Sequence, residues 1–384
     1  MRLPDLIAQT FEEKFQSKSI IVRSPGRINF IGEHTDYNEG FVLPAAIDKS
    51  IYLGFAKNNT RSCRVYSLDF KEEQTFSLDN LKPAKGWVNF VMGVANAIQK
   101  NGDELEGFDC VFGGDIPIGA GLSSSAALEN GVGFGLNQLF DLKLERLELL
   151  KFSQQAEHEF VGVKCGIMDM FASMMGKKDQ VIRLDCRSLA HSYFPLELGV
   201  YQLILCNTKV AHSLAESAYN QRREECSEGV KLVKKQFPEV NSLRDINLEM
   251  LDKMKGEMSA VVYKRCAYVI RENERLIKTC EALAKQDLEA VGQFLYGSHD
   301  GLSLDYEVSC PELDFLVDYT RELPYVLGAR MMGGGFGGCT LNLIKKSDKK
   351  AFIAAISAAY AGKFNRQMES YEVNVADGTG LINL

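Results

Sequence analysis

Residues 116–129, IPIGAGLSSSAALE, constrain the fold more than any other segment because they place small residues directly before a helix-forming run. Gly119 and Gly121 allow positive φ angles and close approach to the backbone. The serines at 123–125 stand where the helix begins, and serine is a favoured N-cap residue. Free N–H groups at a helix start point outward, and the helix dipole favours an anion there. The segment therefore predicts a phosphate-binding turn, although the same residues also suit an ordinary tight turn with a capped helix.

Two familiar phosphate-binding patterns do not fit this segment. A Walker A loop requires Gly-Lys-Ser/Thr after the glycines, and no lysine follows them here. In the dinucleotide-binding fingerprint a third glycine stands where this chain has Ser124. The sequence therefore argues against a dinucleotide-dependent oxidoreductase.

Composition narrows the possible partners. A net charge of -7 over 384 residues opposes binding to a nucleic-acid polymer, but it leaves room for a small phosphate ligand held locally. The ten cysteines include no Cys-x-x-Cys pair, which predicts free thiols in a reducing compartment. Residues 1–15 form an amphipathic pattern without a signal-peptide core, and no apolar run reaches membrane-spanning length. We therefore expect a cytoplasmic protein with no nucleic-acid or membrane partner.

The apolar pattern is strand-rich early in the chain and helix-rich late. Because the strands do not alternate regularly with helices, the fold class is expected to be α+β. The change of pattern near residues 180–200 predicts two lobes, one over 1–180 and the other over 181–384. Strands are expected at 20–23, 41–47, 51–56, 108–112, 180–184, 201–205 and 340–344, and helices at 88–100, 144–160, 211–236, 246–285 and 350–361.

Three segments in order resemble the GHMP small-molecule kinases, a family named for galactokinase, homoserine kinase, mevalonate kinase and phosphomevalonate kinase. Residues 117–126 match the pattern Pro-x-Gly-x-Gly-Leu-Ser-Ser-Ser-Ala of the family's nucleotide loop. Residues 328–344, GARMMGGGFGGCTLNLI, are similar to its C-terminal glycine-rich motif. Residues 26–47, GRINFIGEHTDYNEGFVLPAAI, look like the signature of its galactokinase members. Further matches between these segments extend the resemblance over most of the chain.

The resemblance implies a two-lobed GHMP kinase fold with the active site between the lobes. It also implies ATP-dependent phosphorylation of galactose at the anomeric hydroxyl, giving galactose 1-phosphate and ADP, with Mg²⁺ as the cofactor ion. Two alternatives stay open: a kinase for another pyranose such as N-acetylgalactosamine, and a sensor that binds sugar and ATP on the same scaffold. Family sensors tend to lose residues of the serine-alanine loop, which is intact here. The oligomeric state is left open, and a monomer is compatible with the sequence.

By resemblance, Asp169 is the catalytic residue that orients and deprotonates the sugar hydroxyl, and Arg27 lies beside it. Phosphoryl transfer depends on positioning and charge neutralisation, so Asp169 could act as a base or as an orienting charge. The cluster Gly-Glu-His-Thr-Asp-Tyr at 32–37 offers acceptors for sugar hydroxyls, although a solvated polar loop would have the same composition. The residues that the resemblance assigns to the sugar are Glu33, His34, Thr35, Asp36, Gly166 and Tyr219.

The resemblance also assigns residues to the nucleotide and to the metal. Glu157 and Ser125 would bind Mg²⁺, which takes one or two protein oxygens and keeps phosphate oxygens and waters as its other ligands. Read without the resemblance, Glu157 is an ordinary solvated helix residue. The residues assigned to the nucleotide are Gly119, Ala120, Gly121, Leu122, Ser123, Ser124, Ser125 and Ser67.

Two positions depart from the resembled galactokinase pattern. Met170 follows the proposed catalytic aspartate where many of those proteins have glutamine, and Gly301 stands where they tend to have serine. Neither change removes a reactive group, but both leave the identity of the sugar open.

Overall fold

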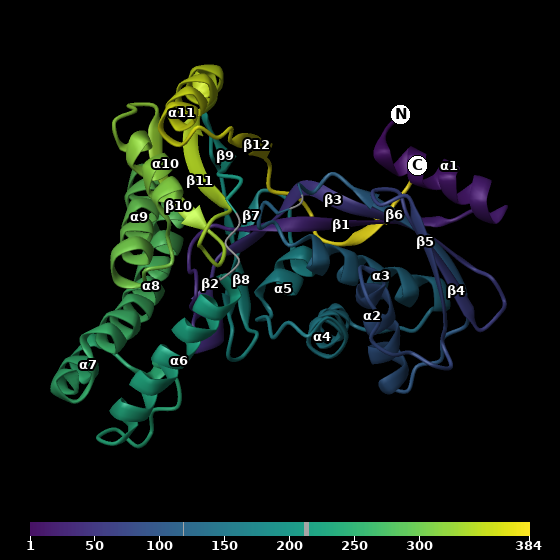
Figure 1. Ribbon diagram of the computed structural model, residues 1–384, viewed down its shortest axis with the longest axis horizontal. Coiled ribbons are helices and arrows are strands. Elements are labelled where there is room, and N and C mark those ends of the chain that lie inside the picture. The colour runs from purple at the N-terminus through teal and green to yellow at the C-terminus, as the bar shows by residue number, and fades with distance from the viewer. Residues whose placement is uncertain (118, 211–214) are drawn as a thin grey trace.

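The computed structural model describes residues 1–117, 119–210 and 215–384. Helices and strands are mixed and form two lobes, as the sequence predicts for an α+β fold (Figure 1). The first lobe contains the early strands and helices α1 to α5, and the second contains the long helices and a sheet of its own.

The first lobe is built on a six-stranded sheet in the order β13-β1-β3-β6-β4-β5. Strand β4 pairs parallel with β6, and the other neighbours pair antiparallel. The expected strands at 41–47 and 51–56 are divided differently: a short β2 ends at Val42, and one long β3 runs through the predicted turn. The amide of Asp48, inside that stretch, donates to the carbonyl of Asn374 at 2.9 Å, which helps to keep the backbone extended. The strands are β1 (Ile20–Asn29), β3 (Pro44–Lys57), β4 (Ser62–Ser67), β5 (Glu72–Ser77), β6 (Phe108–Gly114) and β13 (Gly380–Ile382).

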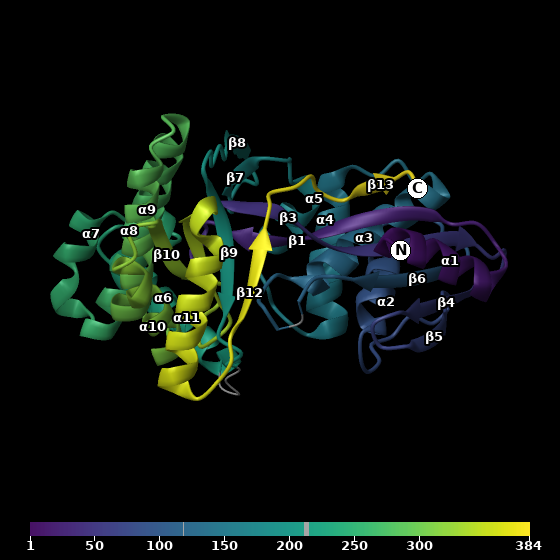
Figure 2. The ribbon, with the colours of Figure 1, turned by 90° about the horizontal axis from the view of Figure 1, so that it is seen from above.

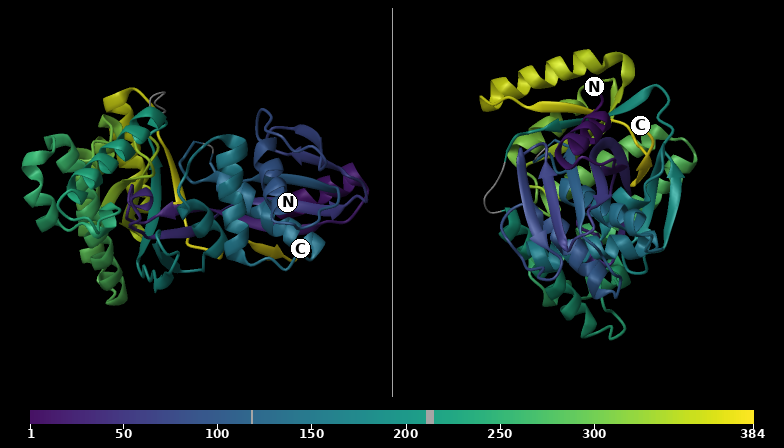
Figure 3. Two further views of the ribbon diagram at one scale, coloured as in Figure 1. Left: turned by 90° about the horizontal axis from the view of Figure 1, so that it is seen from below. Right: turned by 90° about the vertical axis from the view of Figure 1, so that its right-hand side faces the viewer.

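Helices cover both faces of this sheet. Helix α1 lies against the outer face, α3 and α5 lie against the opposite face, and α2 and α4 pack against α3 (Figures 1 and 3). The expected helix at 88–100 matches α2, but the one expected at 144–160 ends early in a π-helical turn, Glu157–Val161. The helices are α1 (Leu3–Phe15), α2 (Val88–Lys100), α3 (Ser124–Phe140), α4 (Arg146–Ala156) and α5 (Met168–Met175).

The second lobe carries a four-stranded sheet in the order β10-β11-β9-β12. Side chains alternate across β9: Leu203 and Leu205 join the core of the first lobe, whereas Ile204 and Cys206 pack with α10 and α11. Because one face of this sheet is buried against the first lobe, the two lobes share a continuous apolar core. The strands are β9 (Tyr201–Asn207), β10 (Val326–Met332), β11 (Cys339–Lys345) and β12 (Glu369–Val373).

The helices of the second lobe lie on the other side of this sheet (Figure 2). The long helix expected at 246–285 is interrupted, because the backbone becomes extended at Met258 and the side chain of Ser259 then caps a new helix. The first four residues of the helix expected at 211–236 lie outside the described residues. The helices are α6 (Ala215–Lys234), α7 (Leu248–Lys253), α8 (Ala260–Ala284), α9 (Leu288–Asp300), α10 (Pro311–Arg321) and α11 (Lys349–Phe364).

Two connections tie the lobes together. A three-stranded sheet pairs β2 (Phe41–Val42) with β7 (Gln180–Asp185) and β8 (His191–Pro195). After β12 the chain returns to the first lobe, where β13 pairs with β1. Division of the chain near residue 180 therefore stays a prediction. No helix in the described ranges has the length and apolarity needed to cross a membrane.

Candidate functional site

The glycine-rich turn before α3 leaves open space. Gly119 and Gly121 have φ angles of 74° and 71°, and a Cβ at either position would meet nothing within 4 Å. Ser123 precedes the helix in a left-handed conformation, with φ 57° and ψ 58°. Its side chain does not cap the helix as the sequence suggests, because the hydroxyl donates to Asp169 Oδ2 instead.

Arg27 and Asp169 form a bidentate pair. Arg27 Nε donates to Asp169 Oδ1 and Nη2 donates to Oδ2, both at 2.8 Å. The guanidinium is buried, and Nη1 also donates to the carbonyl of Gly121 at 2.6 Å. Asp169 lies in the first turn of α5 and keeps 26% of its side chain exposed. The pair therefore connects β1, α5 and the glycine-rich turn around one accessible carboxylate.

Two cavities meet beside this pair. The larger has a volume of about 600 Å³. It is lined by Arg27, Asp169 and five of the six residues assigned to the sugar: Glu33, His34, Asp36, Gly166 and Tyr219. The smaller, about 270 Å³, is lined by the turn at 119–125. Arg27, Gly333 and Gly334 belong to both cavities, so the second glycine-rich segment lies at their junction. We call them the sugar-signature cavity and the turn cavity.

Glu33 lies in the sugar-signature cavity, and groups of the second lobe hold its carboxylate. The guanidinium of Arg330, which is fully buried on β10, lies 2.9 Å from Glu33 Oε1. The amide of Gly333 donates to the same oxygen at 2.8 Å. Arg330 Nη1 also donates to the carbonyls of Asn29 and Phe30 at 3.2 Å. Glu33 and Arg330 therefore fasten β10 to the end of β1 at the floor of the cavity.

His34 is buried and neutral. Nδ1 lies 2.8 Å from the hydroxyl of Tyr37, and Nε2 has no hydrogen-bond partner among the described residues. Burial lowers the pKa of His34 to about 3, so the ring is uncharged at neutral pH. The ring lines the sugar-signature cavity, where its neutral state suits contact with an uncharged ligand.

Asp36 and Gly166 lie in contact. A Cβ at Gly166 would collide with Asp36 Oδ2, so only glycine allows this approach. Removal from bulk water raises the pKa of Asp36 to about 6, and repulsion from Asp169 and Glu33 adds to the shift. Glu33, Asp36, Asp169 and Glu224 all line the sugar-signature cavity, and Asp36 is protonated about half of the time near pH 6.

Tyr219 projects from α6 into the same cavity, and its ring centroid lies 5.4 Å from that of His34. Burial raises the pKa of its hydroxyl, which stays protonated. The neighbouring arginines differ from each other. Arg222 is buried and donates to the carbonyls of Tyr306 and Glu307, whereas Arg223 lines the cavity.

Ser125 and Glu157 are close to each other below the turn cavity. A hydrogen bond from Ser125 lowers the pKa of Glu157, but burial outweighs it and raises the pKa overall. Glu129 follows Ser125 by one helical turn on α3 and is fully buried, and neither of its carboxyl oxygens has a partner in the part of the chain that is described. These oxygen donors suit a hard cation such as Mg²⁺. Over the same part of the chain no group of three or more His, Cys, Asp or Glu side chains is arranged to hold a metal ion.

Three residues that the sequence assigned to the sugar or the nucleotide, Ser67, Thr35 and Ala120, line neither cavity. Ser67 is buried on β4 and accepts the amide of Phe70, away from both cavities. The Thr35 hydroxyl donates to backbone carbonyls of Gly32 and Phe41 and so shapes the signature loop. Ala120 and Leu122 are buried, and only Leu122 lines the turn cavity.

Sequence reasoning did not single out Arg330 or Glu129 as site residues. Arg330 has a signal that could have revealed it: a charged residue inside an otherwise apolar strand pattern must have a buried partner. Glu129 carries a similar signal, because it stands in a helix segment of small and apolar residues. The sequence alone does not show which group lies beside either buried charged side chain.

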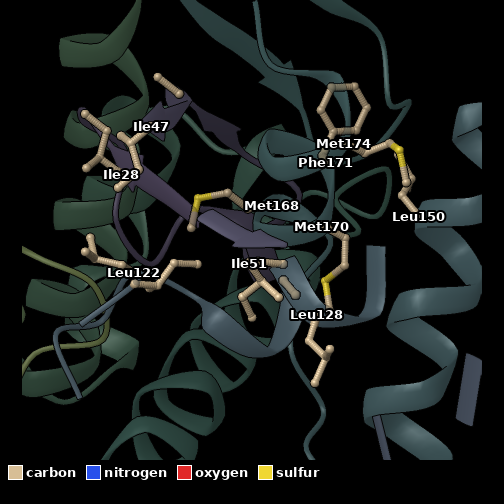
Figure 4. Close-up of a cluster of buried hydrophobic side chains, with 14 of the residues drawn as sticks. Ile28, Ile47, Ile51, Leu122, Leu128, Leu150, Met168, Met170, Phe171 and Met174 are labelled. Carbon is tan, nitrogen blue, oxygen red and sulfur yellow. The ribbon is translucent and has the colours of Figure 1, made fainter. Parts of the chain in front are cut away.

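The two residues that depart from the galactokinase pattern, Met170 and Gly301, both lie outside the lining of the sugar-signature cavity. Met170 is buried and packs in the core of the first lobe near Leu128 and Ile51 (Figure 4). Gly301 is buried against the ring of Tyr268, which a Cβ would crowd. Neither residue lines the cavity, so neither alters its surface directly.

Comparisons with known proteins agree with this arrangement. Family models match the GHMP kinases N terminal domain over residues 89–177, the GHMP kinases C terminal domain over 280–362, and the galactokinase galactose-binding signature over 9–57. The galactokinase of Clostridium acetobutylicum is 41% identical, with 98% of this chain and 100% of that protein covered. That of Thermotoga maritima is 39% identical, with 93% and 98% covered.

Solved structures extend the comparison to the fold. Lactococcus lactis galactokinase complexed with galactose matches with a TM-score of 0.95 and 34% identity, with 99% of this chain and 100% of that chain covered. A mevalonate kinase matches with a TM-score of 0.68 at 16% identity, which bears on the fold alone. The chain therefore belongs to the GHMP kinase family and, within it, to the galactokinases.

Proposed function

We propose that the protein transfers the terminal phosphoryl group of ATP to the anomeric hydroxyl of galactose, giving galactose 1-phosphate and ADP. The galactokinase relatives support this activity over nearly the whole chain. One observation carries the proposal: Arg27 lies where the sugar-signature cavity meets the turn cavity, and it holds Asp169 toward the first of them. A sugar in one cavity and a triphosphate in the other would meet at that point.

In the reaction, Asp169 is assigned to receive the proton of the anomeric hydroxyl. The hydroxyl oxygen forms the new bond to phosphorus, the bond between that phosphorus and the bridging oxygen breaks, and ADP leaves with the bonding electrons. Arg27 fixes the carboxylate by two hydrogen bonds and adds positive charge near the transferred group. Ser123 fills one lone pair of the carboxylate and so helps to orient it. Because the transition state is loose, this alignment accounts for much of the catalysis.

The sugar residues divide by role. Asp36 and His34 line the cavity and are assigned to sugar hydroxyls, and Tyr219 closes the cavity from the second lobe. Glu33, already bound by Arg330 and Gly333, has its second carboxyl oxygen left for a hydroxyl. Gly166 contributes by letting Asp36 approach. Thr35 holds the signature loop in shape through its backbone partners.

The nucleotide is assigned to the turn at 119–125, where outward N–H groups and the start of α3 favour phosphate. Ser125 and Glu157 would hold Mg²⁺, which supplies positive charge to the phosphate oxygens when it is bound. The closeness of these two side chains and their oxygen donors fit that ion. Ser67 is also assigned to the nucleotide, although it lines neither cavity.

A panel of sugars tests the proposal. Purified protein with Mg²⁺ and ATP is given galactose, N-acetylgalactosamine, glucose and other pyranoses, and ADP release is followed by a coupled assay. Galactose is expected to give the highest kcat/KM. A higher value for N-acetylgalactosamine would identify another sugar kinase, and binding of galactose and ATP without ADP release would identify a sensor.

Three further assignments accompany this proposal. We assign the chain to the cytoplasm, since its ten cysteines are free thiols in the structure. We place the lobe boundary near residue 180, with the C-terminal strand returning to the first lobe. The oligomeric state is left open, with a monomer compatible, and size-exclusion chromatography with light scattering would determine it.

A further inference from the structure

A third cavity lies apart from the sugar-signature and turn cavities. It has a volume of about 510 Å³, within the usual range for small-molecule sites. Its lining residues come from β13 and the segment before it, the end of α5 and the start of α4, and Figure 2 shows these elements near one another. None of its lining residues lines either of the other two cavities. We call it the back cavity; it is lined by Arg23, Arg146, Tyr193, residues 174–177 and residues 377–382.

The charge of the back cavity is positive. Arg23, Arg146 and Lys177 contribute three cations, and Asp377 contributes the one carboxylate among the lining side chains. Among the described residues, none of the three cations forms an ion pair with a carboxylate. Asp377 accepts the amide of Lys178 at 2.9 Å. The lining side chains therefore carry a net charge of about +2, and no carboxylate in the described part of the chain pairs with the three cations.

Backbone carbonyls hold the two arginines in place. Arg23 donates to the carbonyls of Asp377 and Ile47 at 2.9 and 3.0 Å. Arg146 donates through Nη1 to the carbonyls of Met174 and Thr379 at 2.7 and 2.8 Å. Its Nε and Nη2 donate to no partner in the part of the chain that the structure describes. Carbonyl contacts fix a guanidinium without cancelling its charge, so the fork stays ready for an anion.

Lys177 completes the arrangement at the edge of the cavity. Its ammonium lies 3.9 Å from the ring centroid of Tyr193, whose hydroxyl donates to the carbonyl of Met175 at 2.8 Å. This contact keeps the lysine over the cavity rather than out in solvent. Gly380 also lines the cavity and leaves open space where a side chain would stand.

We propose that the back cavity binds a phosphate-bearing small molecule. A phosphate monoester carries about −1.5 to −2 charges at pH 7, which matches the net charge of the lining side chains. Arginine forks match the spacing of phosphate oxygens, and the volume leaves room for an organic group attached to the phosphate. A single carboxylate would neutralise only half of the charge.

Calorimetric titration of the full chain tests this site. The active site is first filled with galactose, Mg²⁺ and a non-hydrolysable ATP analogue, and glucose 6-phosphate or inorganic phosphate is then added. Saturable binding of the ester alone identifies an esterified ligand, and equal binding of both probes identifies free phosphate as sufficient. Lys177→Gln is expected to weaken binding roughly tenfold, because it removes one charge-assisted contact. Lys178→Gln, the neighbouring lysine whose side chain does not line the cavity, is the matched control and is expected to change nothing.

Arg146→Gln is expected to abolish binding, with thermal unfolding measured to verify that the variant is folded. Absence of saturable binding by either probe overturns the proposal. So does an equal affinity for wild type and Lys177→Gln. These outcomes do not depend on phosphoryl transfer, because the two lysine variants are compared directly and without turnover.

Discussion

Two glycine-rich turns border the turn cavity, and they use glycine for different purposes. In the first, at 119–125, Gly119 and Gly121 have positive φ angles and open space where a Cβ would be. In the second, at 333–338, a Cβ at Gly335 would collide with a backbone carbonyl. The first turn therefore keeps volume for a ligand at both of these glycines. The second turn is divided: Gly333 and Gly334 line the cavities, and Gly335 packs against its own chain.

Each turn also serves one carboxylate of the site. The first turn reaches Asp169 through the Ser123 hydroxyl and through Arg27, which donates to the Gly121 carbonyl. The second turn reaches Glu33 through the amide of Gly333. The comparison teaches that glycine content alone does not identify a ligand-binding turn. The surrounding backbone decides whether the space beside the glycine is free.

The largest effect is expected at the carboxylate that the first turn serves. Asp169→Asn removes the proton acceptor but keeps the shape of the side chain, and kcat is expected to fall by ~10²–10⁴. Steady-state kinetics with galactose and ATP measure this, and circular dichroism checks the fold. Near-normal turnover would remove Asp169 from the mechanism.

A matched pair of alanine substitutions separates the two turns. Gly335→Ala is expected to lower the free energy of unfolding by roughly 3 kcal/mol, since it combines a positive φ of 86° with a collision at the carbonyl of Val308. Gly119→Ala is expected to cost only about 1 kcal/mol, because its strain comes from the φ angle alone. Denaturant unfolding of both variants gives the two values. Equal losses of stability in the two variants would contradict the distinction between the open position of Gly119 and the packed position of Gly335.

Ser123→Ala sharpens the claim that the first turn positions Asp169. The hydroxyl donates to a carboxylate, and a bond of that kind contributes about 1.5–3 kcal/mol, so kcat is expected to fall roughly 10- to 100-fold with little change in KM for galactose. Ser124→Ala is the control, because Ser124 lines the turn cavity. It is expected to raise KM for ATP and to leave kcat nearly unchanged. The reverse pattern would assign Ser123 to the nucleotide alone.

The smallest effect is expected from the titration of Asp36 in the sugar-signature cavity. Its folded-state pKa is raised to about 6, above the ordinary value, so the unfolded chain loses this proton first as pH rises. As pH rises from about 4 to 6, Asp36 therefore lowers the free energy of unfolding, and its contribution stays unfavourable above that range. The ionised form accepts sugar hydroxyls, so KM for galactose is expected to fall roughly tenfold from pH 5 to pH 7.

Asp36→Asn provides the control for this pH dependence. The variant is expected to show a flat KM over the same range and to gain stability relative to wild type as pH rises from 4 to 6. His34 does not interfere, since burial lowers its pKa to about 3 and it stays neutral throughout. A wild-type pH profile retained in the variant would assign the titration to another group.

The order of motifs allowed much of the site to be anticipated from the sequence. The glycine-rich turn, Arg27 and Asp169 lie together as the family resemblance implies, and the α+β class and two lobes are confirmed. The strand pattern at 41–56 was divided wrongly, because the tertiary contact at Asp48 keeps β3 extended. The N-cap role expected of Ser123 also failed, because its hydroxyl finds a charged acceptor on another helix. In both cases a partner distant in sequence outweighs local preference.

The sequence by itself determined the period of the strands and helices, the position of the glycine-rich turns and the chemical types available at the site. Only the tertiary structure decided which carboxylates face the cavity and which charges are compensated. Glu33 meets Arg330 across the lobes, Met170 turns into the core, and Glu129 is buried with no hydrogen-bond partner among the residues that the structure describes. The physical reason is that hydrogen bonding and burial depend on distances between segments far apart in the chain, and local sequence does not encode those distances.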